Sequence, residues 1–380
     1  MYLDNASTTK LDPQVLDTMI EFMKSEYGNP SSMSYPQSIS AKEYLKSSRM
    51  RVANLINCEE DEIIFTSGAT ESNNFIIKGV ARKLKHKGNH IITTKIEHKA
   101  VLEVCKYLNE YHNFEITYLD VDSNGNINLK EFEQSIKENT ILVSIMWANN
   151  EIGNLNPIRE ISSICKEHNI LFHTDATQAL GKIKINTKDI NIDFMSASAH
   201  KIYGPKGIGF AYIKNDELDL KDDETTPLPL LHGGEQEENL RAGTHSMHNI
   251  VGFAKACEIA QNDMDTYVLK LKTLEDKLIK QLKNNIDNII FNGDLKNKVP
   301  GIINISIPNI ENGLLIKALS HKYSLSAGSA CTLGKPSYVL KAIGKENISS
   351  NTLRISLSKF SDETVFNLAK DLKEYIIKFS

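Results

Sequence analysis

Short apolar runs alternate with longer stretches in which apolar residues recur every three or four positions. Between about residue 60 and residue 215, runs of the first kind are EIIF (62–65), HIITT (90–94), FEITYL (114–119) and TILVSIM (140–146), and each is followed by an amphipathic stretch. Three more strand-like runs follow, at 170–174, 192–198 and 207–213. This alternation is typical of repeated βαβ units and predicts an α/β fold with a mainly parallel sheet.

The pattern changes after residue 213. A charged, proline-containing stretch (214–230) reads as a surface connection, and a long helical pattern covers residues 249–283. Strand-like runs at 302–308 and 352–358, a helical run at 313–323 and a closing helix at 361–378 then predict a smaller α+β unit. We therefore expect a large α/β domain (13–256) and a small α+β domain made of residues 1–12 and 257–380.

Composition narrows the class of protein. A chain of 380 residues with 41% apolar residues can bury a large core, and its formal net charge of -4 gives no basic excess for phosphate-backbone binding. The sequence MYLDNASTTK does not resemble a signal peptide, and no apolar run approaches the roughly 20 residues needed to span a bilayer. We expect a cytoplasmic protein that has no direct nucleic-acid or membrane partner.

The cysteines form an odd set without close pairs, which fits neither a disulfide framework nor a zinc site; they are Cys58, Cys105, Cys165, Cys257 and Cys331. A lone cysteine is usually a small buried hydrophobe. Cys331 differs because it lies in SAGSACTLGKPSYVL, a glycine- and serine-rich stretch between two helical runs, where a loop is more plausible than a core position.

The segment TSGATESNN (66–74) follows a predicted strand and opens a predicted helix near Glu71. Gly68, Ala69 and Thr70 would then lie at a helix N-terminus, where backbone N–H groups suit a phosphate. The segment matches neither a Walker loop nor a dinucleotide fingerprint. By itself, it is more typical of an ordinary strand-to-helix turn capped by Ser67 or Thr70.

Two further segments place chemical groups at predicted strand ends. Asp175 ends the apolar run ILFHT, where a carboxylate could bind a cationic ring nitrogen or simply cap a helix. His200 and Lys201 follow the run at 192–198. A phosphate site, a carboxylate and an amine together are what pyridoxal 5'-phosphate (PLP) requires, although spacing alone does not separate PLP enzymes from other phosphate-binding proteins.

A set of motifs resembles a known family. YLDNASTT, YGNPSS, TSGATES, EHKAV, NNEIG, DATQ, SAHKIYGPKG, RAGT and GSACT occur in the order found in cysteine desulfurases of the NifS/IscS type, from residue 2 to about residue 375. The resemblance implies the fold-type I PLP-dependent transferase fold, with a homodimer whose active sites lie near the subunit interface.

The resemblance also implies residue roles. Lys201 resembles the lysine that carries PLP, Asp175 the acid that keeps the ring nitrogen protonated, and His98 the histidine that stacks on the ring. The other implied cofactor and substrate contacts are Ala69, Thr70, Ser198 and His200 for the phosphate, Thr244 for the phosphate of the other subunit, Asn150 and Gln178 near the ring hydroxyl, and Arg354 with Asn150 for the substrate. Arg354 would hold the substrate carboxylate, a task that suits its bidentate fork.

The implied reaction converts L-cysteine to L-alanine. Cys331, as a thiolate, attacks the substrate sulfur and becomes a persulfide, which passes to an acceptor protein such as an Fe–S scaffold or a tRNA thiolase. Selenocysteine lyase activity, or another class V PLP transfer, is the enzymatic alternative. A non-enzymatic partner-binding homologue with attenuated chemistry is the other, suggested by Glu238 and Ser34, where family members carry arginine and histidine.

Three further features qualify this interpretation. An EF-hand pattern is complete at Asp120, Asp122, Asn124, Gly125 and Glu131, but a strand-like run precedes it, so we expect a strand–turn–helix connection without calcium. The remaining histidines show no metal-ligand grouping, and we expect no metal. The loop from Cys331 to Pro336 is two residues shorter than in the family members, which bears on the identity of the sulfur acceptor.

Overall fold

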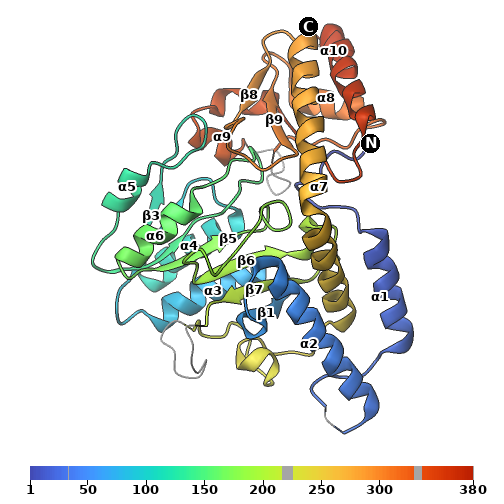
Figure 1. Ribbon diagram of the computed structural model, residues 1–380. Coiled ribbons are helices and arrows are strands. Elements are labelled where there is room, and N and C mark those ends of the chain that lie inside the picture. Colours follow the sequence, from blue (N-terminus) through green and yellow to red (C-terminus); the bar gives the residue numbers. More distant parts are fainter. Residues whose placement is uncertain (33, 216–225, 329–335, 380) are drawn as a thin grey trace.

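A computed structural model describes residues 1–32, 34–215, 226–328 and 336–379. Cys331 and residues 216–225 of the charged connection lie outside the described residues. Within the described parts, the molecule has a large and a small sheet joined by one long helix, α7 (Met247–Asn285) (Figure 1).

The large sheet is mainly parallel, as predicted. Its strands in spatial order are β1 (Ile63–Thr66), β7 (Gly209–Ile213), β6 (Phe194–Ser198), β5 (Leu171–Asp175), β4 (Thr140–Ser144), β2 (His90–Thr94) and β3 (Glu115–Leu119). Only β7 runs against its neighbours, β1 and β6. The carboxyl ends of the other six strands therefore meet at one edge, the usual location of ligands in such sheets.

The strands of the large sheet are continuous apolar runs because both faces of this sheet are buried. Ile63 and Ile64 are both buried, but they belong to different cores on opposite faces of the sheet. One face is covered by α3 (Ala69–Lys83) and α4 (Lys99–His112). The other face packs against residues from α1 (Pro13–Ser25), α2 (Pro36–Ile56), α5 (Leu129–Gln134), α6 (Ile158–Glu167) and the first part of α7. The result is a three-layer α/β/α arrangement in which parallel strands are shielded on both sides.

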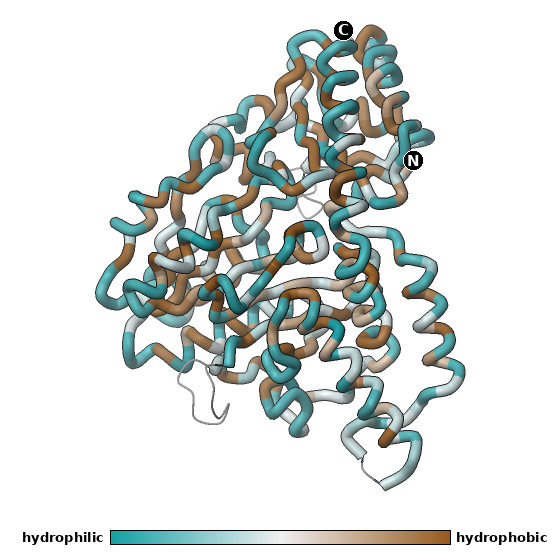
Figure 2. Tube along the Cα trace, in the orientation of Figure 1, coloured by the Kyte–Doolittle hydropathy of each residue, from teal (hydrophilic) through white to brown (hydrophobic). Residues whose placement is uncertain are grey.

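The small sheet is antiparallel and has its own core. Its order is β10 (Thr352–Ser356), β9 (Ile302–Ser306) and β8 (Ile290–Asn292), and the accompanying helices are α8 (Asn312–Leu319), α9 (Tyr338–Ala342) and α10 (Asn367–Phe379). Buried apolar residues of β9, β10, α8 and α10 form this core, and Figure 2 shows apolar positions along these strands and helices. Val339 and Leu340 of α9 pack instead with Ile96 and Ile152. Along α7, side chains up to Ala260 pack in the large core and those from Met264 onward in the small one. The predicted domain limits, 13–256 for the large domain and 1–12 with 257–380 for the small one, remain a prediction because α7 runs continuously past residue 256.

Short 3-10 helices complete the backbone: η1 (Glu60–Glu62), η2 (Ala199–Lys201), η3 (Gln236–Asn239), η4 (Glu346–Asn351) and η5 (Glu363–Phe366). Among the described residues, no helix combines the length and the apolar character that crossing a bilayer requires.

The EF-hand-like segment is the predicted strand–turn–helix connection. It leaves β3, turns at Asp122 and enters α5, which Asn128 caps by accepting hydrogen bonds from the backbone. The carboxylate of Asp122 accepts hydrogen bonds from the N–H groups of Asn124 and Asn126, both at 2.8 Å. This carboxylate therefore stabilises the turn.

Candidate active site

A cavity of about 390 Å³ lies at the edge where the parallel strands end. Most of the predicted cofactor and substrate contacts line it: Ala69, Thr70, His98, Asn150, Asp175, Gln178, Ser198, His200, Lys201 and Arg354. Thr244 is exposed and does not line the cavity of its own chain, and Cys331 lies outside the described residues. The strand-end pattern and the family motifs together thus predicted residues that line one cavity.

The N-terminus of α3 forms one end of the cavity. Its N-cap is Gly68, with φ of 146° and no side-chain cap, so neither Ser67 nor Thr70 caps the helix. The backbone N–H of Ala69 donates to Ser198 Oγ at 2.9 Å, which ties the helix start to the end of β6. A side chain at Gly68 would crowd this contact, because its Cβ would lie 3.0 Å from Ser198 Oγ. The positive end of a helix dipole at this position favours an anion.

Asp175 is the last residue of β5 and is only 4% exposed. One carboxylate oxygen accepts a hydrogen bond from Asn73 Nδ2 at 2.8 Å, and the other accepts from the N–H of Thr177 at 3.0 Å. Residues 177–180 form turns, so Asp175 is not a helix N-cap. Sequence reasoning missed Asn73, although it lies three residues after Thr70 and thus on the same face of α3.

Lys201 ends η2, directly after β6. Its Nζ donates to the backbone carbonyls of Ala6 and Ser7, at 2.7 and 2.6 Å. The N-terminal segment therefore lines the cavity, and the amine is held at its wall.

Two histidines border the cavity in neutral form. His98 is the N-cap of α4, and its Nδ1 accepts from the N–H of Ala100 at 3.1 Å, which orients the ring. Burial lowers the pKa of His98. Burial, reinforced by the positive charge of Lys201, lowers the pKa of His200 to about 4. Nδ1 of His200 lies 3.1 Å from the hydroxyl of Thr8.

A fully buried acid lies beneath this part of the cavity. Glu97 accepts hydrogen bonds from Thr94 Oγ1 and from the N–H of Met146, at 2.9 and 2.8 Å. Burial raises its pKa to about 8, so the carboxyl is predominantly protonated at neutral pH. Glu97 was not predicted, although it stands next to His98 in the motif EHKAV. The hydrogen bonds of Glu97 connect the end of β2 with the residues that follow β4.

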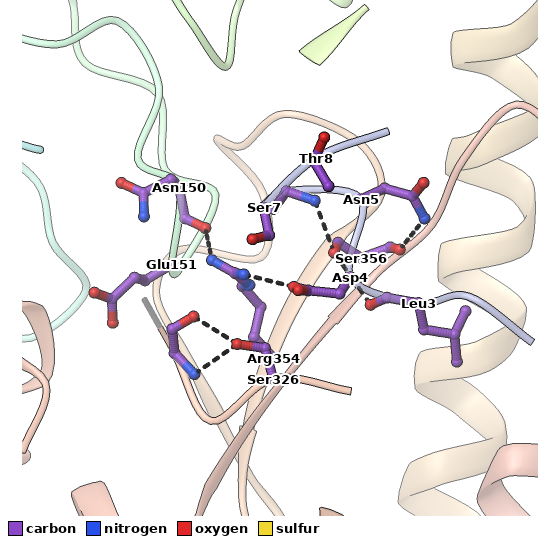
Figure 3. Close-up of polar contacts among 12 residues, drawn as sticks. Leu3, Asp4, Asn5, Ser7, Thr8, Asn150, Glu151, Ser326, Arg354 and Ser356 are labelled. Carbon is purple, nitrogen blue, oxygen red and sulfur yellow. Dashed lines mark hydrogen bonds and ion pairs between the residues drawn. The ribbon is translucent and has the colours of Figure 1, made fainter. Parts of the chain in front are cut away.

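Arg354 enters the cavity from β10 of the small sheet and is 1% exposed (Figure 3). It donates to the carbonyl of Asn150 at 2.9 Å and to Asp4 Oδ1 at 2.7 Å (Figure 3). Asp4 was not assigned a role from sequence, although it belongs to the motif YLDNASTT. The cationic group of the small sheet is thus fixed against both the large sheet and the N-terminal segment.

The residues of the cavity fit PLP. Among the described residues, Asn150 Oδ1, Thr177 Oγ1 and Arg354 Nε are buried without a hydrogen-bond partner, although all three residues line the cavity. Buried polar groups are rarely left unpaired, so such atoms indicate a polar ligand. The cavity falls within the size range of cofactor sites, and its α3 N-terminus, Asp175 and Lys201 match the phosphate, ring nitrogen and aldehyde of PLP.

Residues 237–239 form an unusual turn beside the end of β1. Glu237, Glu238 and Asn239 have φ of 51°, 54° and 65°, the left-handed region that non-glycine residues rarely adopt. Glu237 stabilises this turn, because its buried carboxylate accepts hydrogen bonds from Arg49, His245 and the N–H of Phe65. Glu238 is exposed and lines a separate hollow, so it does not line the cavity of its own chain.

The four described cysteines are buried: Cys58, Cys105, Cys165 and Cys257. Burial raises the pKa of each thiol. Their thiolate forms are therefore scarce, and none of them is suited to nucleophilic chemistry.

Comparison with known proteins agrees with this geometry. The class V aminotransferase family model matches residues 1–365. A cysteine desulfurase IscS from Ehrlichia chaffeensis is 43% identical over 375 residues, covering 98% of this chain and 90% of that protein. A mitochondrial cysteine desulfurase from Saccharomyces cerevisiae is 44% identical over 366 residues, covering 96% of this chain and 72% of that protein.

Solved structures give the same result. A NifS-like protein superposes with a TM-score of 0.91 at 38% identity, and the match covers 100% of both chains. A structure described as SspA in complex with cysteine has a TM-score of 0.82 at 34% identity, covering 95% of this chain and 99% of that one.

Proposed function

The chain belongs to the class V aminotransferase family and, within it, to the PLP-dependent cysteine desulfurases of the NifS/IscS type; from this premise we propose that it converts L-cysteine to L-alanine and retains the sulfur as a persulfide on Cys331. One observation carries the proposal. Lys201, Asp175 and Arg354, which come from two sheets, line a single cavity beside the N-terminus of α3.

Bound PLP supplies an electron sink that stabilises negative charge at the α-carbon of the substrate. Lys201 binds the cofactor and moves the α-proton of the substrate at Nζ. Asp175 holds the proton on the ring nitrogen, and its hydrogen bonds from Asn73 and Thr177 orient the carboxylate for this task.

The phosphate is bound by the start of α3 and by the residues that follow β6. Ala69 and Thr70 contribute the helix N-terminus, and Ser198 can donate its hydroxyl proton because its oxygen already accepts from Ala69. His200 would bind the same group, while Gln178 and Asn150 would bind near the ring hydroxyl. His98, whose side chain is oriented by the N–H of Ala100, would stack on the ring.

Arg354 binds the carboxylate of L-cysteine and so orients the substrate sulfur. Its Nε is without a partner among the described residues, and its two NH groups are already fixed by Asn150 and Asp4. A pre-oriented guanidinium loses little freedom when it binds a carboxylate.

Cys331 completes the reaction as the sulfur acceptor. Its thiolate forms a new S–S bond with the substrate sulfur, the C–S bond breaks, and its electron pair stays with the carbon fragment, which is protonated and released as alanine. The low reactivity of the four buried cysteines supports assigning this step to Cys331.

The setting of the reaction is also part of the proposal. We expect a homodimer in which Thr244 reaches the phosphate of the other subunit, since Thr244 is exposed and large apolar side chains such as Met23, Tyr27 and Ile39 are exposed on or next to α1 and α2. The persulfide passes to an acceptor protein of Fe–S cluster assembly or tRNA thiolation. Unpaired thiols fit the cytoplasm.

The test is to purify the protein, record the visible absorbance of PLP, and measure alanine and sulfide formed from L-cysteine by the wild type and by Cys331→Ala. We expect a yellow protein, with alanine formation lost in the variant and absorbance retained. A colourless, inactive wild type would refute the proposal. Full activity in Cys331→Ala would refute the role of the thiol and leave the cofactor assignment standing.

A further inference from the structure

Glu151 lies in the turn that follows β4 and is completely buried. Its backbone is fixed on both sides: its N–H donates to Asn149 Oδ1 at 2.8 Å, and its carbonyl accepts from Asn304 Nδ2 of β9 at 3.1 Å. The backbone of Glu151 is therefore held at the junction of the two sheets, and Figure 3 shows its side chain pointing away from Arg354.

One end of the segment that carries Cys331 is bound to this carboxylate. Ser337 Oγ donates to Glu151 Oε2 at 2.6 Å and accepts from the N–H of Leu340 at 3.1 Å, so the same hydroxyl caps α9. The next residue, Tyr338, donates its hydroxyl to the carbonyl of Glu97 at 2.9 Å. Residues 337 and 338 are thus attached to the large domain beside His98.

The other end of the segment approaches the same oxygen. A methyl group added at Gly328 would lie 3.2 Å from Glu151 Oε2 and 3.9 Å from Cβ of Ser337. Gly328 also has φ of 136°, which favours glycine. Just before it, Ser326 exchanges backbone hydrogen bonds with Arg354, at 2.7 and 3.4 Å.

These contacts connect both ends of the segment to the proposed substrate-binding arginine. Arg354 donates to the carbonyl of Asn150, the residue before Glu151. Asn150 therefore binds Arg354 through its backbone carbonyl, and the neighbouring Glu151 binds Ser337 through its carboxylate. Burying an acid is costly unless it is paired, and the contact of Glu151 with Ser337 indicates a positioning role.

We propose that Glu151 is a positioning residue for sulfur transfer, which fixes Gly328 and Ser337 relative to Arg354 and so sets where Cys331 meets the substrate sulfur. This inference rests on the proposed desulfurase function and deepens it. A small displacement of reacting groups reduces the rate of a step much more than it reduces binding.

The test compares Glu151→Gln, Ser337→Ala and Ser337→Thr in the PLP-loaded protein. Glu151→Gln and Ser337→Ala should each lower kcat for alanine formation about tenfold, with KM for L-cysteine and PLP absorbance close to wild type. Ser337→Thr keeps the hydroxyl and should restore kcat. A combined Glu151→Gln/Ser337→Ala variant should lose little more than either single variant, since the two residues act through one contact.

A second measurement does not depend on activity. Hydrogen exchange in the protein without substrate should accelerate in peptides covering residues 326–340 for Glu151→Gln and Ser337→Ala. Glu235→Gln removes an exposed carboxylate that lines a separate hollow; it is the control and should leave exchange there unchanged.

Unchanged kcat together with unchanged exchange would overturn the inference. Loss of PLP, or a kcat that Ser337→Thr fails to restore, would also overturn it, because Glu151 would then be merely structural. If the wild type formed no alanine, the proposed function would fail, whereas the exchange comparison would still decide whether Glu151 holds the two ends.

Discussion

The edge of the large sheet and the base of the segment that carries Cys331 hold their residues in different ways. At the sheet edge, Asp175, Ser198 and Lys201 lie at the end of a strand or within three residues of it, so the backbone that bears them is fixed by the β-ladder. At the base of the segment, Gly328 and Ser337 belong to connections, and side-chain contacts with Glu151 place them. A substitution at the sheet edge therefore removes a group that takes part in the chemistry. A substitution at the base of the segment leaves the reacting groups in place but changes their positions.

The largest effect is expected at the sheet edge. Lys201→Ala should lower alanine formation on the order of a thousandfold or more, because the amine that moves the α-proton is lost. The fold should persist, since the strand ladder that carries η2 is untouched. Initial rates and urea unfolding midpoints check both points, and near wild-type turnover in this variant would show that another group moves the proton.

The turn beside the end of β1, which lies outside the cavity lining, should respond through stability. Burial alone would raise the pKa of Glu237, but the ion pair with Arg49 and the bond from His245 hold it at about 2, below its ordinary 4.5. The resulting stabilisation is fully present above pH 4.5 and is lost as the pH falls toward about 2. Glu237→Gln should therefore reduce the free energy of unfolding by about 3 kcal/mol at neutral pH.

Urea unfolding near pH 7 and again at about pH 3 tests this linkage. The difference in the free energy of unfolding between wild type and Glu237→Gln should be smaller at the lower pH. Substituting the exposed neighbour in Glu235→Gln should change this free energy little at either pH. A difference in unfolding free energy that stays constant with pH would contradict the ion pair between Glu237 and Arg49.

A smaller effect is expected where the two regions meet. Arg354→Lys keeps the charge but loses the fork that can hold Asp4, Asn150 and a carboxylate together. We expect kcat/KM for L-cysteine to fall about tenfold, mainly through KM. An unchanged KM would place the substrate carboxylate elsewhere.

The smallest effect is expected for a cysteine away from both regions. Cys257→Ala should leave alanine formation unchanged and cost about 1 kcal/mol of stability, since Cys257 only fills the core. It is the matched control for Cys331→Ala. Loss of activity in Cys257→Ala would show that thiol chemistry is not confined to Cys331.

The positions at strand ends were predictable because they depend on local pattern. The apolar runs located the strands, the parallel topology brought their carboxyl ends together, and Asp175 and Lys201 followed from that. Contacts between distant segments were not predictable in this way. Asp4 and Glu151 carry no periodic signal, and Asn73 is marked only by sharing a helix face with Thr70. Each acquires its partner only when the α3 helix, the N-terminus or the small sheet packs against the site.

Two details of the local backbone were also not predictable from the sequence. Glu238, which stands where family members carry arginine, is placed by a left-handed turn at a separate hollow of its own chain. Ser67 and Thr70 have good capping side chains, but Gly68 takes the N-cap position because the close approach of Ser198 leaves little room for a side chain there.

Peptide mapping of the persulfide tests the central claim most directly. The purified wild type is incubated with L-cysteine in the absence of an acceptor protein, its thiols are alkylated, and the sulfur content of every cysteine-containing peptide is measured by mass spectrometry. The account predicts one additional sulfur atom on the peptide that contains Cys331, with alanine as the co-product. Alanine formation without additional sulfur on Cys331, or with it on Cys58, Cys105, Cys165 or Cys257, would contradict it.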